Sequence, residues 1–406
     1  MSHYSYPPPG GAPNANAPNP LRPYYSASDS PLQSYYNNTL SSATLEEELA
    51  AQNELNSQTA AKELASYGLI KFMTLAIAAP FEAGQTLLQV QYLPNDDGFN
   101  GDELDMAEKM APIEGGAWKA MTELANHPTE GWMSLWKGQY TNWIYEMLHL
   151  FAQPTLEATL NDTFDLYDDT IPLVHLDHVG PNIATMVTSH LVVGFLLSPL
   201  ELVRTRLVVQ TANPLQRKYS GMVNCFSTII QEEGFTALWG GINLFPTLIY
   251  HTLTPLLSNS IPLIIDRVFK LSAADSPFLY SLAELGLNTI ELLIRLPIET
   301  VRKRLQIQAK ADDGRRIAGS KKYRTVVETR KRPYYGMVDC VYRIIKEEGG
   351  HHKRVSSSDG GLIQRPWYSA WGVRGLYTGL GMHLTSNVTL FAIGAVTNLQ
   401  DEGDDW

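Results

Sequence analysis

The chain has 406 residues, two cysteines and a formal net charge of −11, so it is long enough for one large domain or several small ones. The acidic balance argues against a nucleic-acid-binding protein, which needs a basic face. Cys225 and Cys340 are too few for a disulfide scaffold, and no cysteine and histidine spacing predicts a metal site. The mean hydropathy of −0.15 is low for a membrane protein, but polar segments dilute several apolar ones.

The first part of the chain predicts a polar tail followed by an acidic helix. Residues 1–43 are rich in Pro, Asn, Ser and Tyr and hold too few aliphatic side chains to offset chain entropy, so we expect disorder there. The tail resembles neither a secretory signal nor an arginine-rich mitochondrial presequence. Residues 44–65 predict a lead-in helix, since Thr44 and Glu47 have the spacing of a capping box.

Six long and weakly charged segments follow, each near the length of about 20 residues that crosses a bilayer as a helix. They are residues 66–90, 141–160, 182–208, 242–265, 276–306 and 379–399. Prolines and polar residues interrupt them, which a membrane helix tolerates where neighbours or a watery cavity satisfy the freed backbone groups. We predict an all-α membrane protein with six transmembrane helices. A soluble all-α protein with long buried helices is the alternative.

Three of these segments carry one pattern in one register. Each copy has a proline, a glutamate two residues later, and a polar or basic residue three residues after that. The aligned positions are Pro80, Glu82 and Gln85, then Pro199, Glu201 and Arg204, then Pro297, Glu299 and Arg302. The register holds without a gap, so these segments indicate a threefold internal repeat.

A second block follows each copy of the first and strengthens the repeat. It reads EGWMSLWKG at 130–138 and EEGFTALWGG at 232–241, and in the third copy an insert splits it. Residues 219–234 and 334–349 match over their whole length, and the two cysteines fall at the same point of that match. The cysteines are therefore repeat positions rather than a redox pair.

The two blocks together predict three tandem helix pairs, each with a short amphipathic helix in the loop between its long helices. The predicted boundaries are repeat 1 at 66–165, repeat 2 at 180–270, repeat 3 at 275–400 with polar inserts at 309–332 and 350–373, and an acidic tail at 401–406. An even number of spans would place both termini on the same side of the membrane.

These motifs resemble those of the mitochondrial carrier family, whose members have three helix-pair repeats with Pro-x-[Asp/Glu]-x-x-[Lys/Arg] on the odd helices. The resemblance covers about 66–400. It implies the mitochondrial carrier fold, in which the prolines kink the odd helices and the charged residues form a closing network across the central axis. In this chain Glu82, Glu201, Arg204, Glu299 and Arg302 would form that network.

The chain departs from the family pattern in three ways. Gln85 stands where a base is expected, so three carboxylates would face two cations, and Glu82 would need hydration, protonation or another partner. A second network at the far ends of the even helices is approached by IDRVFK at 265–270 alone. The even helices also lack the Lys and Arg that carriers of anions use, since an anion in a low-dielectric cavity needs fixed positive charge.

Four polar residues remain inside the even helices as candidates for a cavity: Glu146, His149, His251 and His383. Ionisable residues inside a membrane segment predict function, and the alternative is a residual polar contact between helices. The loop after the fifth segment is crowded with basic residues between 302 and 332. We expect it either to be a solvated loop or to be attracted to anionic lipid or an acidic partner.

Two functions fit these features. Degenerate repeats, long polar loops and a long tail make the chain most similar to the carrier-like fusion factor of the fungal mitochondrial outer membrane. That resemblance implies a non-transporting, multi-pass scaffold that bridges a mitofusin-like outer-membrane GTPase and a dynamin-like inner-membrane GTPase. Its other expected partners are membrane lipid and, as one option, a second copy in a homodimer. The alternative is a metabolite exchanger of the inner membrane. We expect no enzyme activity, cofactor, bound metal or nucleic-acid partner.

Overall fold

The structure is a computed structural model, and it describes most of the chain beyond the N-terminal tail. The described residues are 42–93, 110, 112–113, 115–167, 173–176, 178–239, 241–272, 275–308, 321–330, 332–348 and 372–401. The predicted tail at 1–43 lies outside them except for its last two residues, and so do most of the two polar inserts and the acidic C-terminal tail.

Six long helices run through the described residues. They are α2 (Ser42–Val90), α5 (Gln139–Thr163), α6 (Val179–Val209), α8 (Leu244–Arg267), α9 (Pro277–Gln306) and α11 (Leu380–Asp401). Three shorter helices lie between them, α4 (Ala117–Asn126), α7 (Met222–Glu233) and α10 (Met337–Glu347). Short 3-10 turns complete the set, η1 (Trp132–Trp136), η2 (Leu173–His175), η3 (Phe235–Ala237), η4 (Gly241–Asn243) and η6 (Gly372–Tyr377). The single β-bridge between described residues joins Gln210 to Thr325.

Three of the long helical stretches are apolar enough to cross a membrane by length and composition. They are Lys62–Val90, Val179–Val209 and Phe235–Arg267. The helices α5, α9 and α11 are 25, 30 and 22 residues long, which is also sufficient to span a membrane. The described chain is therefore helical with three candidate spans, and the six-span arrangement stays a prediction.

The lead-in helix and the first apolar segment form one helix rather than two. The helix α2 begins at Ser42 and continues without a break through Pro80 to Val90. The chain divides into two compact units, residues 1–70 and 71–406, and the division falls inside this helix. Of the first unit, the structure describes the helical residues from Ser42 to Ile70. The packed helices, the apolar clusters and the polar residues between the helices belong to the second unit.

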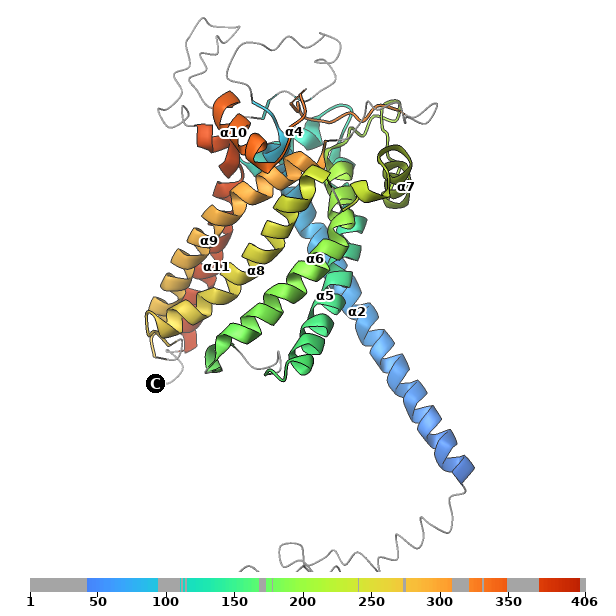
Figure 1. Cartoon of the computed structure of the whole chain (residues 1–406), viewed down its shortest axis with the longest axis vertical. Coiled ribbons are helices and arrows are strands. Elements are labelled where there is room, and N and C mark those ends of the chain that lie inside the picture. The colour runs from blue at the N-terminus through green and yellow to red at the C-terminus, as the bar shows by residue number, and fades with distance from the viewer. Residues whose placement is uncertain are drawn as a thin grey trace, which may run out of the picture. The chain divides into compact units, whose positions relative to one another are not determined.

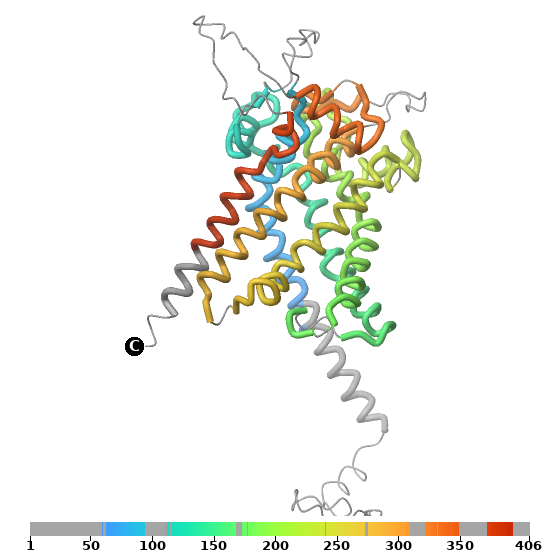
Figure 2. The backbone as a smooth tube through the Cα atoms, turned by 60° about the vertical axis from the view of Figure 1, so that its left-hand side comes forward, coloured from blue at the N-terminus to red at the C-terminus, as the bar shows by residue number. Residues whose placement is uncertain are grey.

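Within the second unit, helices that follow one another along the chain pack side by side. The helix α5 packs on α6, α6 on α8, α8 on α9, and α9 on α11. The long helices come together at the end that carries α4, α7 and α10, and they spread apart toward the opposite end (Figures 1 and 2). We call the former the loop-helix end.

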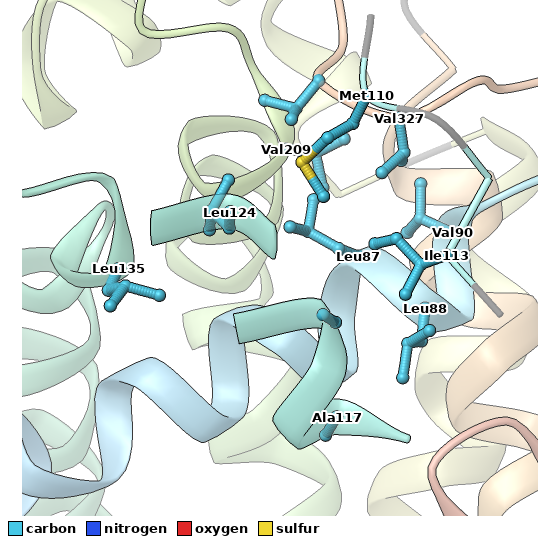
Figure 3. Packing of buried hydrophobic residues seen from close by; sticks show 12 residues of the cluster. Leu87, Leu88, Val90, Met110, Ile113, Ala117, Leu124, Leu135, Val209 and Val327 are labelled. Carbon is cyan, nitrogen blue, oxygen red and sulfur yellow. The ribbon is translucent and has the colours of Figure 1, made fainter. Parts of the chain in front are cut away.

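Three apolar clusters at the loop-helix end join the long helices to the short ones. In repeat 2 the end of α6 packs on α7 around Cys225, and in repeat 3 the end of α9 packs on α10 around Cys340. Both cysteines are fully buried and free. In repeat 1 the end of α2 packs on α4, with Leu87 and Leu124 at the centre (Figure 3). Burying one such leucine contributes about 1.5–3 kcal/mol, so each cluster holds its short helix firmly.

Part of the first polar insert is buried rather than solvated. Residues 321–330 cross the loop-helix end, and Val326 and Val327 are 3% and 1% exposed within the repeat 1 cluster. The expectation of a loop facing solvent or lipid is therefore wrong at these two valines, while Lys321, Lys322 and Arg324 of the same stretch are exposed. Its two consecutive valines, which fit an extended and buried backbone, were the signal for this packing.

Candidate functional site

The repeated motif residues lie on α2, α6 and α9 close to the loop-helix end. Pro80, Pro199 and Pro297 are each inside a helix, where a proline removes one backbone hydrogen bond and bends the axis. The glutamates and bases that follow the prolines join neighbouring helices through three joints. We name each joint by the two repeats that it connects.

The joint between repeats 1 and 2 is an ion pair between Glu82 on α2 and Arg204 on α6. Asn142, near the start of α5, donates a hydrogen bond of 3.3 Å from its Nδ2 to the same carboxylate oxygen of Glu82. The side chains of Arg204 and Glu82 are 30% and 38% exposed. Of the three outcomes expected for Glu82, which were hydration, protonation and another partner, the structure shows the third, because Arg204 supplies a cation.

The joint between repeats 2 and 3 is buried. Arg302 on α9 donates to Glu201 on α6 at 2.7 Å, and the two side chains are 7% and 13% exposed. The Nε2 atom of His251 on α8 lies 3.3 Å from the same Glu201 oxygen. The Arg302 guanidinium also stacks on the Tyr250 ring, 3.8 Å from its centroid. One carboxylate therefore holds three helices together.

A glycine makes this contact of His251 with Glu201 possible. A Cβ atom added to Gly194 on α6 would lie 2.3 Å from the His251 ring. Any other residue at position 194 would therefore displace the imidazole. Gly194 lets α8 bring its histidine against α6, a relation between two residues far apart in sequence.

The joint between repeats 3 and 1 replaces the missing base with a lysine. Glu299 does not meet Gln85; it pairs at 2.7 Å with Lys303, one turn further along α9. The Lys303 ammonium also donates to Gln89 Oε1 on α2 at 2.7 Å. Gln85 instead lies against His383 on α11, with 2.5 Å between the two side-chain nitrogens. The prediction of two cations for three carboxylates is therefore wrong.

A second layer of basic residues lies beyond the joints, and the sequence analysis did not identify it. Arg206 pairs with Glu233 and donates to the Gln306 carbonyl, and Arg304 pairs with Glu348 and donates to the Gln89 carbonyl. In repeat 1, Lys137 takes this place by pairing with Glu130 and donating to the Gln210 carbonyl at 2.9 Å. These glutamates belong to the repeated EG and EEG motifs, so the repeat itself contained the signal.

A cavity of about 430 Å³ lies among the long helices beside the three joints. Its wall includes all four polar residues that we predicted on the even helices: Glu146, His149, His251 and His383. His149 faces His190 of α6, with ring centroids 5.5 Å apart, and lies beside the Tyr145 ring. The joint residues Glu82, Gln85, Glu201, Arg204, Glu299 and Arg302 line the same cavity. In the described part of the chain no cluster of three or more His, Cys, Asp or Glu side chains could hold a metal ion.

The cavity has cations, but they come from the odd helices. Arg295, Lys303, Arg302 and Arg204 all line it, and Lys71 on α2 pairs with Glu146 at 3.2 Å. Arg295 contacts Glu291 at 3.3 Å, while its buried Nε has no hydrogen-bond partner among the described residues. Lys71 and Arg295 were not predicted from the sequence, although an ionisable residue inside an apolar segment was the signal in both cases.

The second charge network of the family pattern, which the sequence approaches only at 265–270, does not form in that stretch of the described structure. Asp266 and Lys270 are both exposed, and no ion pair joins them in the described structure. The joints therefore lie close to the loop-helix end alone among the residues described here.

Comparison with known sequences supports the family resemblance. The sequence model of the family described as "Mitochondrial carrier protein" matches residues 177–254. Solute carrier family 25 member 43 of Mus musculus is 27% identical over 46% of this chain and 47% of its own length. The mitochondrial adenine nucleotide transporter ADNT1 of Arabidopsis thaliana is 24% identical over 71% of this chain and 77% of its own length. ADP/ATP translocase 4 of Mus musculus is 23% identical over 71% of this chain and 80% of its own length.

These similarities support a relationship to the mitochondrial carrier family and a mitochondrial membrane as the location. They give no support to the outer-membrane fusion factor or to an outer-membrane location. This chain spans about half the length of the first relative and about four-fifths of the other two.

Proposed function

We propose that this protein is a solute carrier that exchanges a small charged metabolite across the mitochondrial inner membrane. The observation that carries the proposal is the cavity of about 430 Å³, lined by ionisable side chains and bordered by three joints between the repeats. A cavity of this size between helices is typical of a small-molecule site, and the polar lining of this one suits a charged solute. We also propose that the protein crosses the membrane with six helices and that it moves its solute without catalysing a reaction.

The residue that we expect to hold an anionic group of the solute is Arg295. Arg204, Arg302 and Lys303 each make an ion pair with a glutamate across or along the helices, which ties them to the joints. Arg295 pairs with Glu291 on the same helix at 3.3 Å, outside the joints. It lies on the cavity wall, its side chain is 27% exposed, and its Nε has no partner among the described residues. A guanidinium can bind carboxylate or phosphate through two parallel hydrogen bonds.

The test is exchange in proteoliposomes that contain the full chain. The solutes to offer first are adenine nucleotides, basic amino acids and S-adenosylmethionine, because relatives are named for carrying them. We expect saturable counter-exchange of at least one solute, and a loss of at least about tenfold in Arg295→Gln. The matched control is Lys119→Gln on α4, whose side chain is 53% exposed, and it should leave the rate unchanged. No exchange of any offered solute would overturn the proposal.

The fusion scaffold is the second proposal, and one observation favours it. The three cations at the joints are all paired, so the cavity holds few groups that could bind a solute. Under this proposal the protein would sit in the outer membrane and bind a mitofusin-like and a dynamin-like GTPase. Protease treatment of intact mitochondria tests it directly, because an outer-membrane scaffold needs residues 1–41 in the cytosol. Protection of that tail by an intact outer membrane would exclude it.

A further inference from the structure

Residues 321–330, which we call the strap, form backbone hydrogen bonds to two repeats at once. The Val326 amide donates to the Val209 carbonyl at 2.9 Å, and the Thr211 amide donates to the Arg324 carbonyl at 3.1 Å. The amides of Tyr92 and Met110 donate to the Glu328 and Val326 carbonyls at 2.9 Å each. The strap therefore connects the end of α6 in repeat 2 to the chain that leaves α2 in repeat 1.

The strap is also packed into the apolar cluster of repeat 1. Val326 and Val327 are almost fully buried against Leu87, Val90 and Met110, and Val209 of α6 joins the same cluster. Figure 3 shows Val327 beside Met110 and Val209, above Leu87. Pulling the strap away would expose both valines to water, and the loss of buried apolar surface opposes this release.

Side chains hold both ends of the strap. The Tyr323 hydroxyl donates to the Arg206 carbonyl at 3.0 Å, and its ring packs on Tyr219 with centroids 5.7 Å apart. At the other end, Arg330 forms two hydrogen bonds to the Glu347 carboxylate of α10, at 2.7 and 3.0 Å. All three repeats are thus joined by one short segment at the loop-helix end.

We propose that the strap is a latch that keeps the loop-helix end of the cavity closed, and that its release sets how often this end opens. This inference rests on the proposed carrier function, because an exchanger has to open both ends in turn. Opening at the loop-helix end requires α2 and α6 to separate. They cannot separate while one backbone segment is bonded to Tyr92 and to Val209.

A distance measurement tests the latch without any solute. Spin labels are attached at Lys119→Cys on α4 and Val223→Cys on α7, which lie in repeats 1 and 2 and are 53% and 73% exposed at the native residues. The natural cysteines are buried and stay unlabelled. In the double variant Val326→Ser with Val327→Ser, we expect a second population longer by on the order of 5 Å. The control Leu215→Ser, at a position 82% exposed, should keep the native distribution.

A distance distribution identical in the valine variant and in the native protein would overturn the latch. If the valine variant does not fold, Tyr323→Phe replaces it, because that change removes one hydrogen bond and keeps the ring. The same second population is expected, at a smaller fraction, and its absence in this variant would also overturn the proposal.

A reversible cross-link tests the latch in the opposite direction. Thr325 and Gln210 are paired across the antiparallel bridge, so cysteines at both positions lie within reach of a disulfide. In proteoliposomes we expect the oxidised Gln210→Cys, Thr325→Cys protein to exchange adenine nucleotides at least about tenfold more slowly than after reduction. Equal rates before and after reduction would overturn the latch alone. Absence of exchange in the native protein would overturn the carrier function, and the distance measurement would still decide the latch.

Discussion

The joint between repeats 2 and 3 and the joint between repeats 1 and 2 use the same two residue types in very different surroundings. Glu201 and Arg302 are nearly buried and are supported by His251 and Tyr250, whereas Glu82 and Arg204 are about one-third exposed. A buried ion pair is costly to break because the remaining charge stays out of water, whereas an exposed pair is screened. The same motif therefore makes one firm joint and one weak joint.

This difference suggests where the molecule opens. The weak joint connects α2 with α6, and these are the helices that the strap ties together from the loop-helix side. The firm joint connects α6 with α9, and its ion pair is the more buried of the two. A carrier built this way would move repeat 1 against a more rigid pair of repeats 2 and 3.

The largest expected effect comes from breaking the firm joint. Arg302→Met leaves the Glu201 carboxylate buried beside His251 and should lower the free energy of unfolding by about 3–5 kcal/mol. The matched variant Arg204→Met breaks the exposed joint and should cost at most about 1 kcal/mol. Denaturant unfolding in mild detergent measures both values. Equal losses in the two variants would remove the distinction between the joints.

The third joint offers a repair experiment. Lys303→Gln should cost about 2–3 kcal/mol, because Glu299 is 8% exposed and would lose its cation. Gln85→Arg restores a base at the position where the repeat pattern has one. Combined with Lys303→Gln, it should recover about 1–2 kcal/mol, which a double-mutant cycle in denaturant unfolding would detect. Purely additive losses would show that position 85 cannot reach Glu299.

A smaller effect should follow from filling the space beside His251. Gly194→Ala places a Cβ against the imidazole and should cost about 1–3 kcal/mol while displacing His251 from Glu201. The control is Gly286→Ala on α9, where an added Cβ has no neighbour within 4 Å. That change should stabilise the helix by about 0.5–1 kcal/mol. A shift of the melting temperature in the same direction in both variants would contradict the close approach of His251 on α8 to Gly194 on α6.

The smallest effect at neutral pH concerns the two thiols at equivalent positions of repeats 2 and 3. Burial raises the pKa of Cys225 and of Cys340 to about 12, from an ordinary value of 9. Above about pH 9 the unfolded chain therefore loses these protons while the folded protein keeps them. The free energy of unfolding should be unchanged between pH 7 and 8 and should fall as the pH rises above 9. At pH 8 the thiolate fraction is about a thousandfold below that of a free thiol. Alkylation with iodoacetamide should thus need denaturant, and rapid labelling of the native protein would contradict the burial of Cys225 on α7 and Cys340 on α10.

Much of this organisation could be predicted from the sequence alone. The threefold register placed the prolines, glutamates and bases on three helices. The match between 219–234 and 334–349 made Cys225 and Cys340 equivalent repeat positions, and in the structure each is buried in the corresponding apolar cluster. Repeated spacing predicts which segments are helical and where the motif residues lie on each helix, because every copy of a repeat has the same local geometry. Lys303 was also within reach of this reasoning, since it stands four residues after Glu299 on one helix.

Only the tertiary structure decided which partners the side chains take. Gln85 meets His383 and Lys303 meets Gln89, because the helices of different repeats approach at distances that no local pattern contains. The burial of Val326 and Val327 depends on a loop of repeat 3 crossing onto repeat 1, so composition alone suggested a polar insert there. The sequence determined the repeated elements and their charges. The long-range packing decided that one joint is buried, one exposed and one rebuilt with a lysine, since desolvation depends on what surrounds a charge rather than on its neighbours in the chain.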